Sequence, residues 1–408
     1  MTMKKLVLAF ALVGCSSQPD VLEARKIPMA LAPDVAQVVT ANNQFAIDLY
    51  KQTAPSAANM IMSPFSVSTA FAMLDAGAAT TSDAELRSTF HWDLAGDQLH
   101  AAYGALLTSI DTGRTYGNYT LGTANKLFGQ QGFPFAQPFL DVTKTDYQAE
   151  LQPVDFENHA DQAIDTIDQW VSDQTDAKIP QLFAPGDLDS STVLALVNAI
   201  LFQGTWEQPF DADATANATF TRGDGSTVQA PTMTKQDTLA AGPIPNGRVI
   251  VLPFAGKDLE MVILLPNAAD GLPALESALT GAQLSTWIGA AQASTEPSEV
   301  TLPKFKLELP IDLATTLAAL GITTIWQPDT ADLSGIDGAR DLYVNKAVHK
   351  AMISVDEHGA EAAAATGIGV GDASAPEPIR IDHPFVFAIH DAVTNSVLFI
   401  GRVEDPTL

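Results

Sequence analysis

The chain has almost no cysteine: Cys15 is the only one in 408 residues. A single thiol cannot form an intramolecular disulfide, so the fold must depend on a hydrophobic core. Apolar residues make up 46% of the sequence, which is enough for a sizeable core. After about residue 33 the sequence shows no Pro/Gly/Ser-rich linker, charge block or internal repeat. We therefore expect one large domain over residues 34–408.

Positively charged residues are also scarce. The sequence has 21 Lys and Arg against 48 Asp and Glu, which gives a formal net charge of −27. Such an acidic surface repels nucleic acids and heparin-like polyanions, so we expect neither as a partner. The simplest interpretation of the charge is solubility.

The motifs of common enzyme classes are missing. No G-x-S-x-G, H-E-x-x-H or P-loop pattern occurs. The G-x-G that begins at Gly367 is not followed by a helix, and His358 with Glu361 has no further donors for a metal ion nearby in the sequence. We expect no enzymatic activity, no cofactor and no metal site.

The apolar run near the N-terminus is too short to cross a bilayer. Residues 6–13 follow two lysines, which is typical of a secretory signal. The sequence Leu12-Val13-Gly14-Cys15 resembles a bacterial lipobox, in which the cysteine becomes the lipidated first residue. We predict a lipoprotein signal peptide over residues 1–14, a lipid anchor on Cys15 and a tether over residues 15–33. The protein would then be held at the outer membrane, in the periplasm or at the cell surface. The alternative is an ordinary secretory signal in which the cysteine occurs by chance, and the protein would then be extracellular.

Hydrophobic periodicity predicts several helices. The first begins at Pro33, is capped by Asp34, and turns inward Val35, Val38, Val39, Phe45, Ala46 and Leu49. Residues 66–77 are apolar almost all round, which indicates a buried helix. Two further helices are expected, one over residues 161–172 with Ile164, Ile167, Trp170 and Val171 inward, and one over residues 312–320 that Asp312 caps and Gly321 ends.

Strand patterns are equally frequent. The apolar residues 192–202 indicate a central strand, and residues 342–355 a strand before a loop. Two hairpins are predicted, over residues 248–265 and 385–403. Residues 299–309 alternate with a change of phase, which a bulge near Pro303 and Lys304 would explain. The whole pattern indicates an α+β chain with mainly antiparallel sheets.

The most informative segment is residues 356–366, which read D-E-H-G-A-E-A-A-A-A-T. Four consecutive alanines favour a helix, but the neighbouring glycines and the lack of an apolar face argue against one. Every second residue from Ala360 to Val370 is uncharged, and the last two, Ile368 and Val370, are β-branched. This period of two predicts a loop that carries a latent strand with one side fit for burial.

This segment resembles the reactive-loop hinge of a serpin, a protease inhibitor that traps its target by inserting this loop into its own sheet. Other motifs in the same order support the resemblance, including N-M-I-M-S-P-F-S from Asn59, A-N-K-L-F from Ala124, N-A-I-L-F-Q-G-T-W-E-Q-P-F from Asn198 and L-S-G-I from Leu333. The hinge departs from the family pattern once, because Ala360 stands where Thr or Ser is usual. The residues that match the hinge are Glu357, Gly359, Ala360, Glu361, Ala362, Ala363, Ala364, Ala365 and Thr366.

The resemblance implies a single serpin fold with three mainly antiparallel sheets surrounded by about nine helices, and an exposed reactive loop over residues 357–378. It also implies that Ser63, Ser66, Asn198 and His349 form a buried polar cluster beneath the strands that must separate. In relatives a residue matching Trp206 lies where the loop enters the sheet, and residues matching Lys304 and Glu357 bridge the top of the sheet.

The reactive bond follows from the family spacing. In inhibitory relatives the cleaved residue lies fourteen positions after the hinge glycine, and here this is Ala373, followed by Ser374. The Pro384-Phe385 pair gives the same register. Alanine suits proteases with a small primary pocket, such as elastase-like or subtilisin-like enzymes. Cleavage after Asp372 by an Asp-specific protease is the alternative.

The predicted function is therefore inhibition of serine proteases by loop insertion and covalent trapping, by a monomer. Papain-like cysteine proteases remain possible targets, because trapping needs only a covalent intermediate. The alternative is a non-inhibitory relative that acts as a binding or chaperone-like module. Such relatives tend to have bulky, charged or proline residues in the hinge, whereas the residues here are small.

Overall fold

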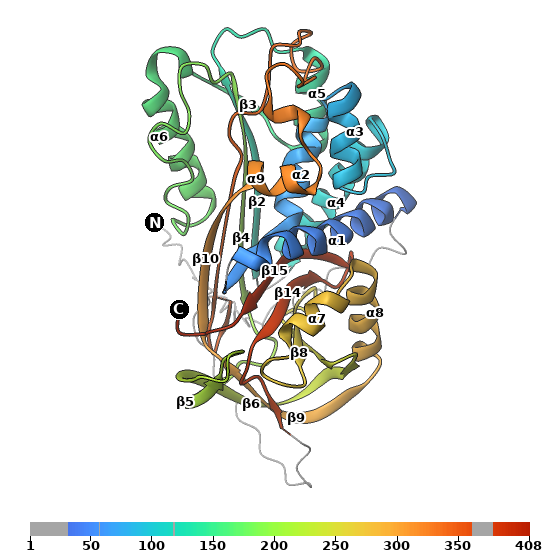
Figure 1. Ribbon diagram of the computed structural model, residues 1–408, viewed down its shortest axis with the longest axis vertical. Coiled ribbons are helices and arrows are strands. Elements are labelled where there is room, and N and C mark those ends of the chain that lie inside the picture. The colour runs from blue at the N-terminus through green and yellow to red at the C-terminus, as the bar shows by residue number, and fades with distance from the viewer. Residues whose placement is uncertain (1–31, 57, 117–118, 361–377) are drawn as a thin grey trace, which may run out of the picture.

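The computed structural model describes residues 32–56, 58–116, 119–360 and 378–408 (Figure 1). Nine α-helices lie within these ranges. They are α1 (Pro33–Thr53), α2 (Pro64–Asp75), α3 (Thr80–Thr89), α4 (Asp97–Tyr116), α5 (Gln137–Tyr147), α6 (Phe156–Gln174), α7 (Leu272–Ala278), α8 (Gly281–Gln292) and α9 (Leu313–Leu320).

The strands of the described residues form two hydrogen-bonded networks. One is a six-stranded sheet in the order β10-β11-β12-β4-β2-β3, and the other runs β1-β15-β14-β8-β7-β6-β9-β13, with β5 added on β6. The strands are β1 (Met60–Met62), β2 (Tyr119–Gln130), β3 (Leu151–Val154), β4 (Leu194–Thr205), β5 (Asp211–Thr221), β6 (Thr227–Ile244), β7 (Gly247–Pro253), β8 (Leu259–Pro266), β9 (Thr295–Pro303), β10 (Phe305–Asp312), β11 (Val348–Val355), β12 (Gly359–Ala360), β13 (Ile379–Arg380), β14 (Phe385–Asp391) and β15 (Ser396–Val403).

The larger network consists of two sheets that share β6. The first part of β6 pairs with β5 and β9, and its last residues pair with β7. Together with the six-stranded sheet this gives three sheets, as the family resemblance implied. The pairings are antiparallel except for β2 with β3 and β9 with β13.

Helices cover both faces of the six-stranded sheet. In Figure 1, α6 lies on one side of β2 and β4, and α2, α4 and α9 lie on the other. The main hydrophobic core fills the side of α1 and α2 and continues beneath β14 and β15, while a smaller cluster around Phe128, Phe156 and Ile167 packs under α6. The sheet is therefore an internal layer, and strands can separate in it only by moving against packed helices.

The first helix begins where the sequence predicted but is not capped as predicted. All six expected inward residues of α1 are buried. Asp34 lies in the first turn instead of at the N-cap, which is Ala32 and makes no side-chain hydrogen bond. Pro33 occupies the first helical position, and because proline has no N–H it needs no cap there. Asp34 still suits this position, because a negative charge in the first turn complements the helix dipole.

The other predicted helices are present with shifted ends. The buried helix expected over residues 66–77 is α2, which begins at Pro64 with Ser63 as its N-cap. The helix α6 is longer at both ends than residues 161–172, and Trp170 is only half-buried. The short helix α9 matches its prediction, because Asp312 accepts a hydrogen bond from the Ala314 amide and Gly321 ends the helix at a φ of 117°.

The change of phase in residues 299–309 marks a change of sheet, so the predicted bulge is wrong. The strand β9 ends at Pro303 and pairs with β6, whereas β10 begins at Phe305 and pairs with β11. The residue between them, Lys304, donates its amide to the Pro231 carbonyl. Both strands turn alternate residues into the same hydrophobic core, Val300 and Leu302 from β9 and Phe305 and Leu307 from β10, and the phase changes where the chain passes from one sheet to the other.

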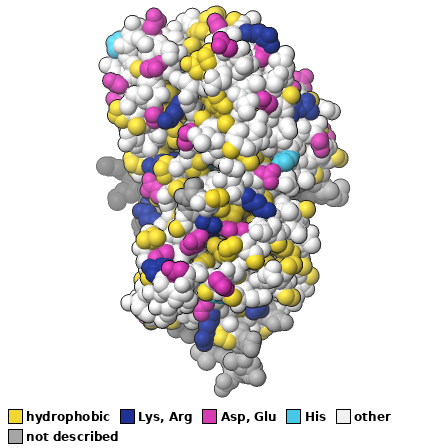
Figure 2. Space-filling view, in the orientation of Figure 1, with side chains coloured by type: hydrophobic (Ala, Val, Ile, Leu, Met, Phe, Trp, Pro, Cys, Tyr) yellow, Lys and Arg dark blue, Asp and Glu magenta, His cyan; other side chains and the backbone are white. Residues whose placement is uncertain are grey.

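Both predicted hairpins form, as β7–β8 and β14–β15. The strand expected over residues 342–355 begins only at Val348, because the preceding residues form a loop in which the Val344 amide donates to the Ile325 carbonyl. On the molecular face in Figure 2, Lys and Arg side chains are scattered among acidic ones. This face offers no continuous basic surface to a polyanion.

Candidate functional site

The site is built around a tight turn that follows β11. The Asp356 amide donates to the Gly359 carbonyl at 2.9 Å, and the Gly359 amide donates back to the Asp356 carbonyl at 3.2 Å. The Asp356 carboxylate accepts a further bond from the His358 amide at 2.9 Å. Glycine is required at position 359, because φ is 148° and a Cβ atom there would lie 1.8 Å from the Gly204 carbonyl oxygen.

The turn leads into β12, a strand of two residues between β11 and β4. Gly359 and Ala360 pair with Thr205 and Gly204 of β4, and Ala360 also pairs with Val355 of β11. The Ala360 side chain is 1% exposed. A small residue is therefore needed here, and alanine fits although the family usually has Thr or Ser. The first residue of the predicted latent strand, Ala360, thus lies in the sheet.

Beyond β12 the two neighbouring strands are not joined to each other. Among the described residues, positions 194–203 of β4 pair only with β2, and positions 348–354 of β11 pair only with β10. The facing edges of β4 and β11 therefore each carry a row of backbone donors and acceptors, and no ladder of hydrogen bonds joins the two strands over these positions. Such edges favour the addition of a strand. We name this region, between positions 194–203 and 348–354, the slot.

Trp206 contacts the turn at the end of the slot next to β12. Its indole Nε1 donates to the Asp356 carbonyl at 2.9 Å, and its amide donates to the His358 carbonyl at 2.8 Å. The indole is buried and stacks on Phe254 with ring centroids 4.6 Å apart. The structure thus places Trp206 in direct contact with the hinge turn.

Lys235 is a member of the site that sequence reasoning missed. Its side chain is 3% exposed, and its Nζ lies 4.8 Å from the Phe210 ring centroid and 5.8 Å from the Trp206 ring centroid. The ammonium also contacts the Asp237 carboxylate at 2.8 Å and donates to the Gln208 carbonyl at 2.8 Å. Burial lowers the pKa of Lys235, and Asp237 opposes this shift. This cation fixes the two aromatic rings that flank the turn.

Glu357 connects the turn to two other elements. Its carboxylate accepts from Lys304 Nζ at 2.7 Å and from Thr215 Oγ1 at 2.8 Å, and its carbonyl accepts from the Phe210 amide at 2.9 Å. Burial opposes the ionisation of Glu357, but the hydrogen bonds from Lys304 and Thr215 outweigh it and hold the pKa of Glu357 below its usual value. The bridge implied by the resemblance is present, and Thr215, from the irregular part of β5, is an addition.

The polar cluster beneath the sheet joins β11 to α2 and β15. His349 Nε2 accepts from the Ser63 amide at 2.9 Å, and Ser63 Oγ donates to the Leu398 carbonyl at 2.7 Å. Ser63 Oγ also accepts from the Ser66 amide at 3.1 Å, which caps α2. Burial lowers the pKa of His349 to about 4, so the ring is neutral at physiological pH. Asn198 lies in β4 opposite Asn125, but its side chain is not among those described.

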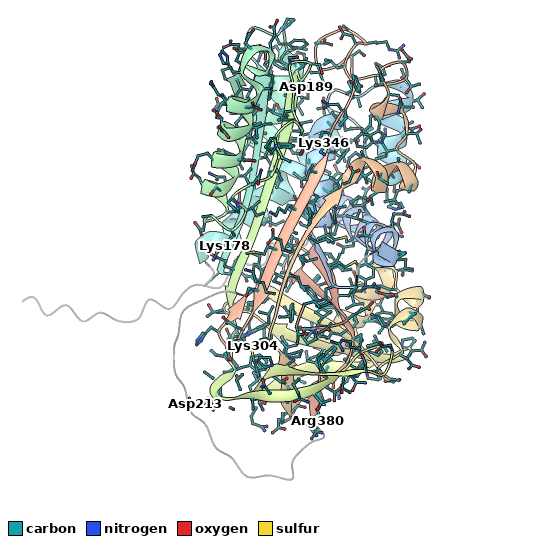
Figure 3. All side chains as sticks on the ribbon, turned by 60° about the vertical axis from the view of Figure 1, so that its left-hand side comes forward. Lys178, Asp189, Asp213, Lys304, Lys346 and Arg380 are labelled. Carbon is teal, nitrogen blue, oxygen red and sulfur yellow. The ribbon has the colours of Figure 1, made fainter. Side chains whose placement is uncertain are left out.

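Several predicted site residues lie outside the described residues. They are Cys15, the hinge residues Glu361, Ala362, Ala363, Ala364, Ala365 and Thr366, and the reactive bond between Ala373 and Ser374. The described residues that flank this loop, Ala360 and Ile379, belong to different sheets. In Figure 3, Lys304 lies near the end of the six-stranded sheet, and Asp213 of β5 and Arg380 of β13 lie beyond it. No group of three His, Cys, Asp or Glu side chains within the described ranges is arranged to hold a metal ion.

Comparison with known proteins agrees with this geometry. The family model of the serpins (serine protease inhibitors) matches residues 40–406. The human leukocyte elastase inhibitor is 39% identical over 382 residues, and the bovine one is 40% identical over 380 residues; each match covers 91% of this chain and 100% of the relative.

Solved structures give the same result. The crystal structure of uncleaved ovalbumin has a TM-score of 0.82 at 30% identity and covers 91% of this chain and 100% of its own. The crystal structure of maspin has a TM-score of 0.83 at 26% identity and covers 92% of this chain and 100% of its own. The chain belongs to the serpin family of serine protease inhibitors.

Proposed function

We propose that this serpin inhibits serine proteases by inserting its reactive loop into the six-stranded sheet after cleavage. The observation that carries the proposal is β12, a strand of two residues at the head of a slot whose two edges have no other partner among the described residues. Nucleation of the new strand has therefore already taken place. Each further loop residue can add backbone hydrogen bonds to β4 and to β11.

The reaction begins as ordinary proteolysis. The hydroxyl of the protease serine attacks the carbonyl carbon of Ala373, the bond to the Ser374 nitrogen breaks, and the released amine takes a proton. The acyl-enzyme remains on the Ala373 side, which is now free of β13. Residues 361–370 can then follow Ala360 into the slot, and burial of Ile368 and Val370 would contribute about 1.5–3 kcal/mol each. The acylated protease is carried with the loop before water can hydrolyse the ester.

The residue at the reactive bond sets the class of protease. Ala373 fits a small primary pocket, as in elastase-like enzymes, and the mammalian relatives at 39–40% identity are leukocyte elastase inhibitors. Subtilisin-like proteases have pockets that accept alanine, and papain-like cysteine proteases form the thioester that trapping would require. We include both classes as further targets.

Incubation with pancreatic elastase tests the proposal. We expect a covalent complex that survives denaturing electrophoresis, together with a released fragment whose N-terminus is Ser374. The variant Ala373→Arg serves as the control, because it should lose the elastase complex and gain one with trypsin. Cleavage of the wild-type chain without any complex would contradict inhibition and support the non-inhibitory binding module.

We also propose that the protein is a lipoprotein anchored through Cys15, of the bacterial type. The support is the N-terminal sequence alone, namely two lysines, an apolar run and Leu12-Val13-Gly14-Cys15. Among the described residues no helix is long and apolar enough to cross a membrane. Expression in a bacterial host should place the wild-type chain in the membrane fraction, and Cys15→Ser should move it to the soluble fraction; equal partition of both chains would contradict the anchor.

A further inference from the structure

A cavity of about 180 Å³ lies beneath the end of the slot that is farthest from the hinge. Its floor is α2, one wall is the beginning of β4, and the other wall is the chain that leads into β11. Figure 3 shows Lys346, a residue of this second wall, toward the opposite end of the sheet from Lys304. The lining includes Val67, Phe71, Phe183, Leu194, Val348 and His349.

The size of the cavity and the apolar part of its lining suit a small ring, and polar side chains such as Ser191, Asn345 and His349 lie among the apolar ones. An apolar cavity of about 150 Å³ is large enough to bind benzene, and this one is larger. Leu182, Phe183 and Leu188 of the loop after α6 close one side with apolar groups. Lys346 at the wall pairs with Asp187 at 2.9 Å, so its charge is already balanced and no anionic ligand is required.

One polar side chain that lines the cavity, His349, has a ring nitrogen without a hydrogen-bond partner among the described side chains. His349 is 5% exposed, and its Nε2 accepts from the Ser63 amide, so the ring proton must be on Nδ1. Among the described residues, no acceptor is found for this Nδ1–H. Because His349 lines the cavity, a molecule that brings an acceptor there gains a hydrogen bond from this Nδ1–H.

We propose that this cavity binds an uncharged molecule of the size of one substituted aromatic ring, with a single hydrogen-bond acceptor that meets His349 Nδ1–H. The ligand would lie between Leu194 of β4 and Val348 of β11, where the last inserted loop residues must pass. A molecule bound in the cavity would therefore oppose complete insertion of the reactive loop. This second part rests on the proposed function, whereas binding does not.

A pair of isosteric probes tests the contact with His349. Acetophenone carries a carbonyl acceptor, and α-methylstyrene has a methylene group in its place. We expect acetophenone to bind the uncleaved protein saturably, to raise its melting temperature, and to bind at least about fivefold more tightly than α-methylstyrene. Equal affinity of the two probes, or no saturable binding of acetophenone, would overturn the proposal.

Two variants test the location. Ala70→Phe places a ring in the cavity from α2, and Ser191→Trp covers its rim from an exposed position. Each should abolish the melting shift caused by acetophenone, and Ser191→Trp serves if Ala70→Phe does not fold. An unchanged shift in a folded variant would show binding elsewhere and contradict the proposal.

A third experiment, with elastase and the wild-type chain, tests whether a bound probe opposes loop insertion. Acetophenone should raise the number of serpin molecules cleaved for each protease molecule trapped, and α-methylstyrene should do so less. If elastase is not trapped even without a probe, the proposed function is wrong. The binding measurements with the two probes and the two variants would still test the cavity as a binding site. If acetophenone binds but leaves the ratio unchanged, the regulatory part of the proposal is wrong.

Discussion

His349 is an uncharged histidine enclosed between β11 and the start of α2, and this predicts a pH dependence. Burial lowers the pKa of His349 to about 4, against about 6.5 in an unfolded chain. Between these values the unfolded chain binds the proton and the folded chain does not, so stability falls as the pH falls from 6.5 to 4. The loss is about 3 kcal/mol at most. Urea unfolding measured from pH 7.5 to 4.5 would show it.

The control is His349→Gln, which keeps an acceptor for the Ser63 amide but does not titrate. Its stability at neutral pH should be lower than that of the wild type. Between pH 6.5 and 4.5 the stability of this variant should fall less than that of the wild type, because only other groups then contribute to the pH dependence. If the two chains lose the same stability over this interval, His349 is not the titrating group.

Asp75, at the end of α2, predicts a pH dependence of the opposite sign. Burial, followed by the negative charge of Asp83, raises the pKa of Asp75 to about 7, and Asp75 Oδ1 has no hydrogen-bond partner among the described residues. The folded chain therefore holds the proton more tightly than the unfolded chain. Stability falls as the pH rises from about 4 to about 7, by up to about 4 kcal/mol. Asp75→Asn removes the charge and should raise the melting temperature at pH 8.

The same variant supplies its own comparison at lower pH. At pH 5 the wild-type carboxyl is mostly protonated, so Asp75→Asn should then change the melting temperature little. The substitution Asp83→Asn, at a partly buried position, should give a smaller gain at pH 8, because it removes only the repulsion and leaves Asp75 buried. A gain from Asp75→Asn that is equal at pH 5 and pH 8 would rule out titration as its cause.

Single residues of the site differed in how far the sequence could reveal them. Trp206, Lys304 and Glu357 lie in motifs that match a family, and the structure places all three at the hinge turn. Lys235 and Thr215 belong to no such motif. Their contacts arise only when β6 brings Lys235 to the rings of Trp206 and Phe210 and β5 brings Thr215 to the hinge turn. A lone lysine in a strand gives no sign that two aromatic rings will enclose it.

At the scale of elements, local patterns predicted the strands better than the way the strands assemble. The phase change near Lys304 was visible, but a bulge within one strand and a passage between two sheets produce the same alternation. Only the pairing of β9 with β6 and of β10 with β11 distinguishes them. Likewise, the sequence showed a latent strand that begins at Ala360 but not that Ala360 is already paired between β4 and β11.

The element that matters most for function is β12, and Ala360 tests it. Ala360 is 1% exposed between β11 and β4, so Ala360→Arg would place a charge in the head of the slot. Burial of an unpaired charge is so costly that β12 should not extend into the slot. The acyl-enzyme formed on cleavage should then be hydrolysed, and the protease should be released. We expect elastase to cut the variant at the same bond but to form less than about a tenth of the wild-type complex.

The matched control is Ala360→Thr, which restores the residue type usual in the family. It should still trap elastase, because the side chain is small and uncharged. Both variants should be cut at the bond before Ser374, since the reactive bond is unchanged. Undiminished complex formation by Ala360→Arg would contradict insertion from this end of the slot.

At the scale of the whole molecule, the six-stranded sheet has not reached its most complete pairing. The edges of β4 and β11 lack a ladder between them in the described part of the chain, and a cavity lies beneath their far end. Neither feature could be predicted from the sequence. Both depend on how α2, β4 and the chain before β11 are spaced, and these segments are far apart along the chain.

This incomplete pairing predicts that cutting the loop stabilises the protein. While the loop is joined to β13, Ala360 and Ile379 are held in different sheets, so residues 361–377 cannot fill the slot without detaching one end. Cleavage at Ala373 removes this restraint, and the added strand then pairs on both sides, fills the cavity and buries Ile368 and Val370. We expect the cleaved chain to melt tens of degrees above the uncleaved one, with the two fragments still associated.

A chain cut instead in the 327–342 region, outside the slot, should not gain stability. Equal melting temperatures before and after cleavage at Ala373 would show that the loop does not enter the sheet.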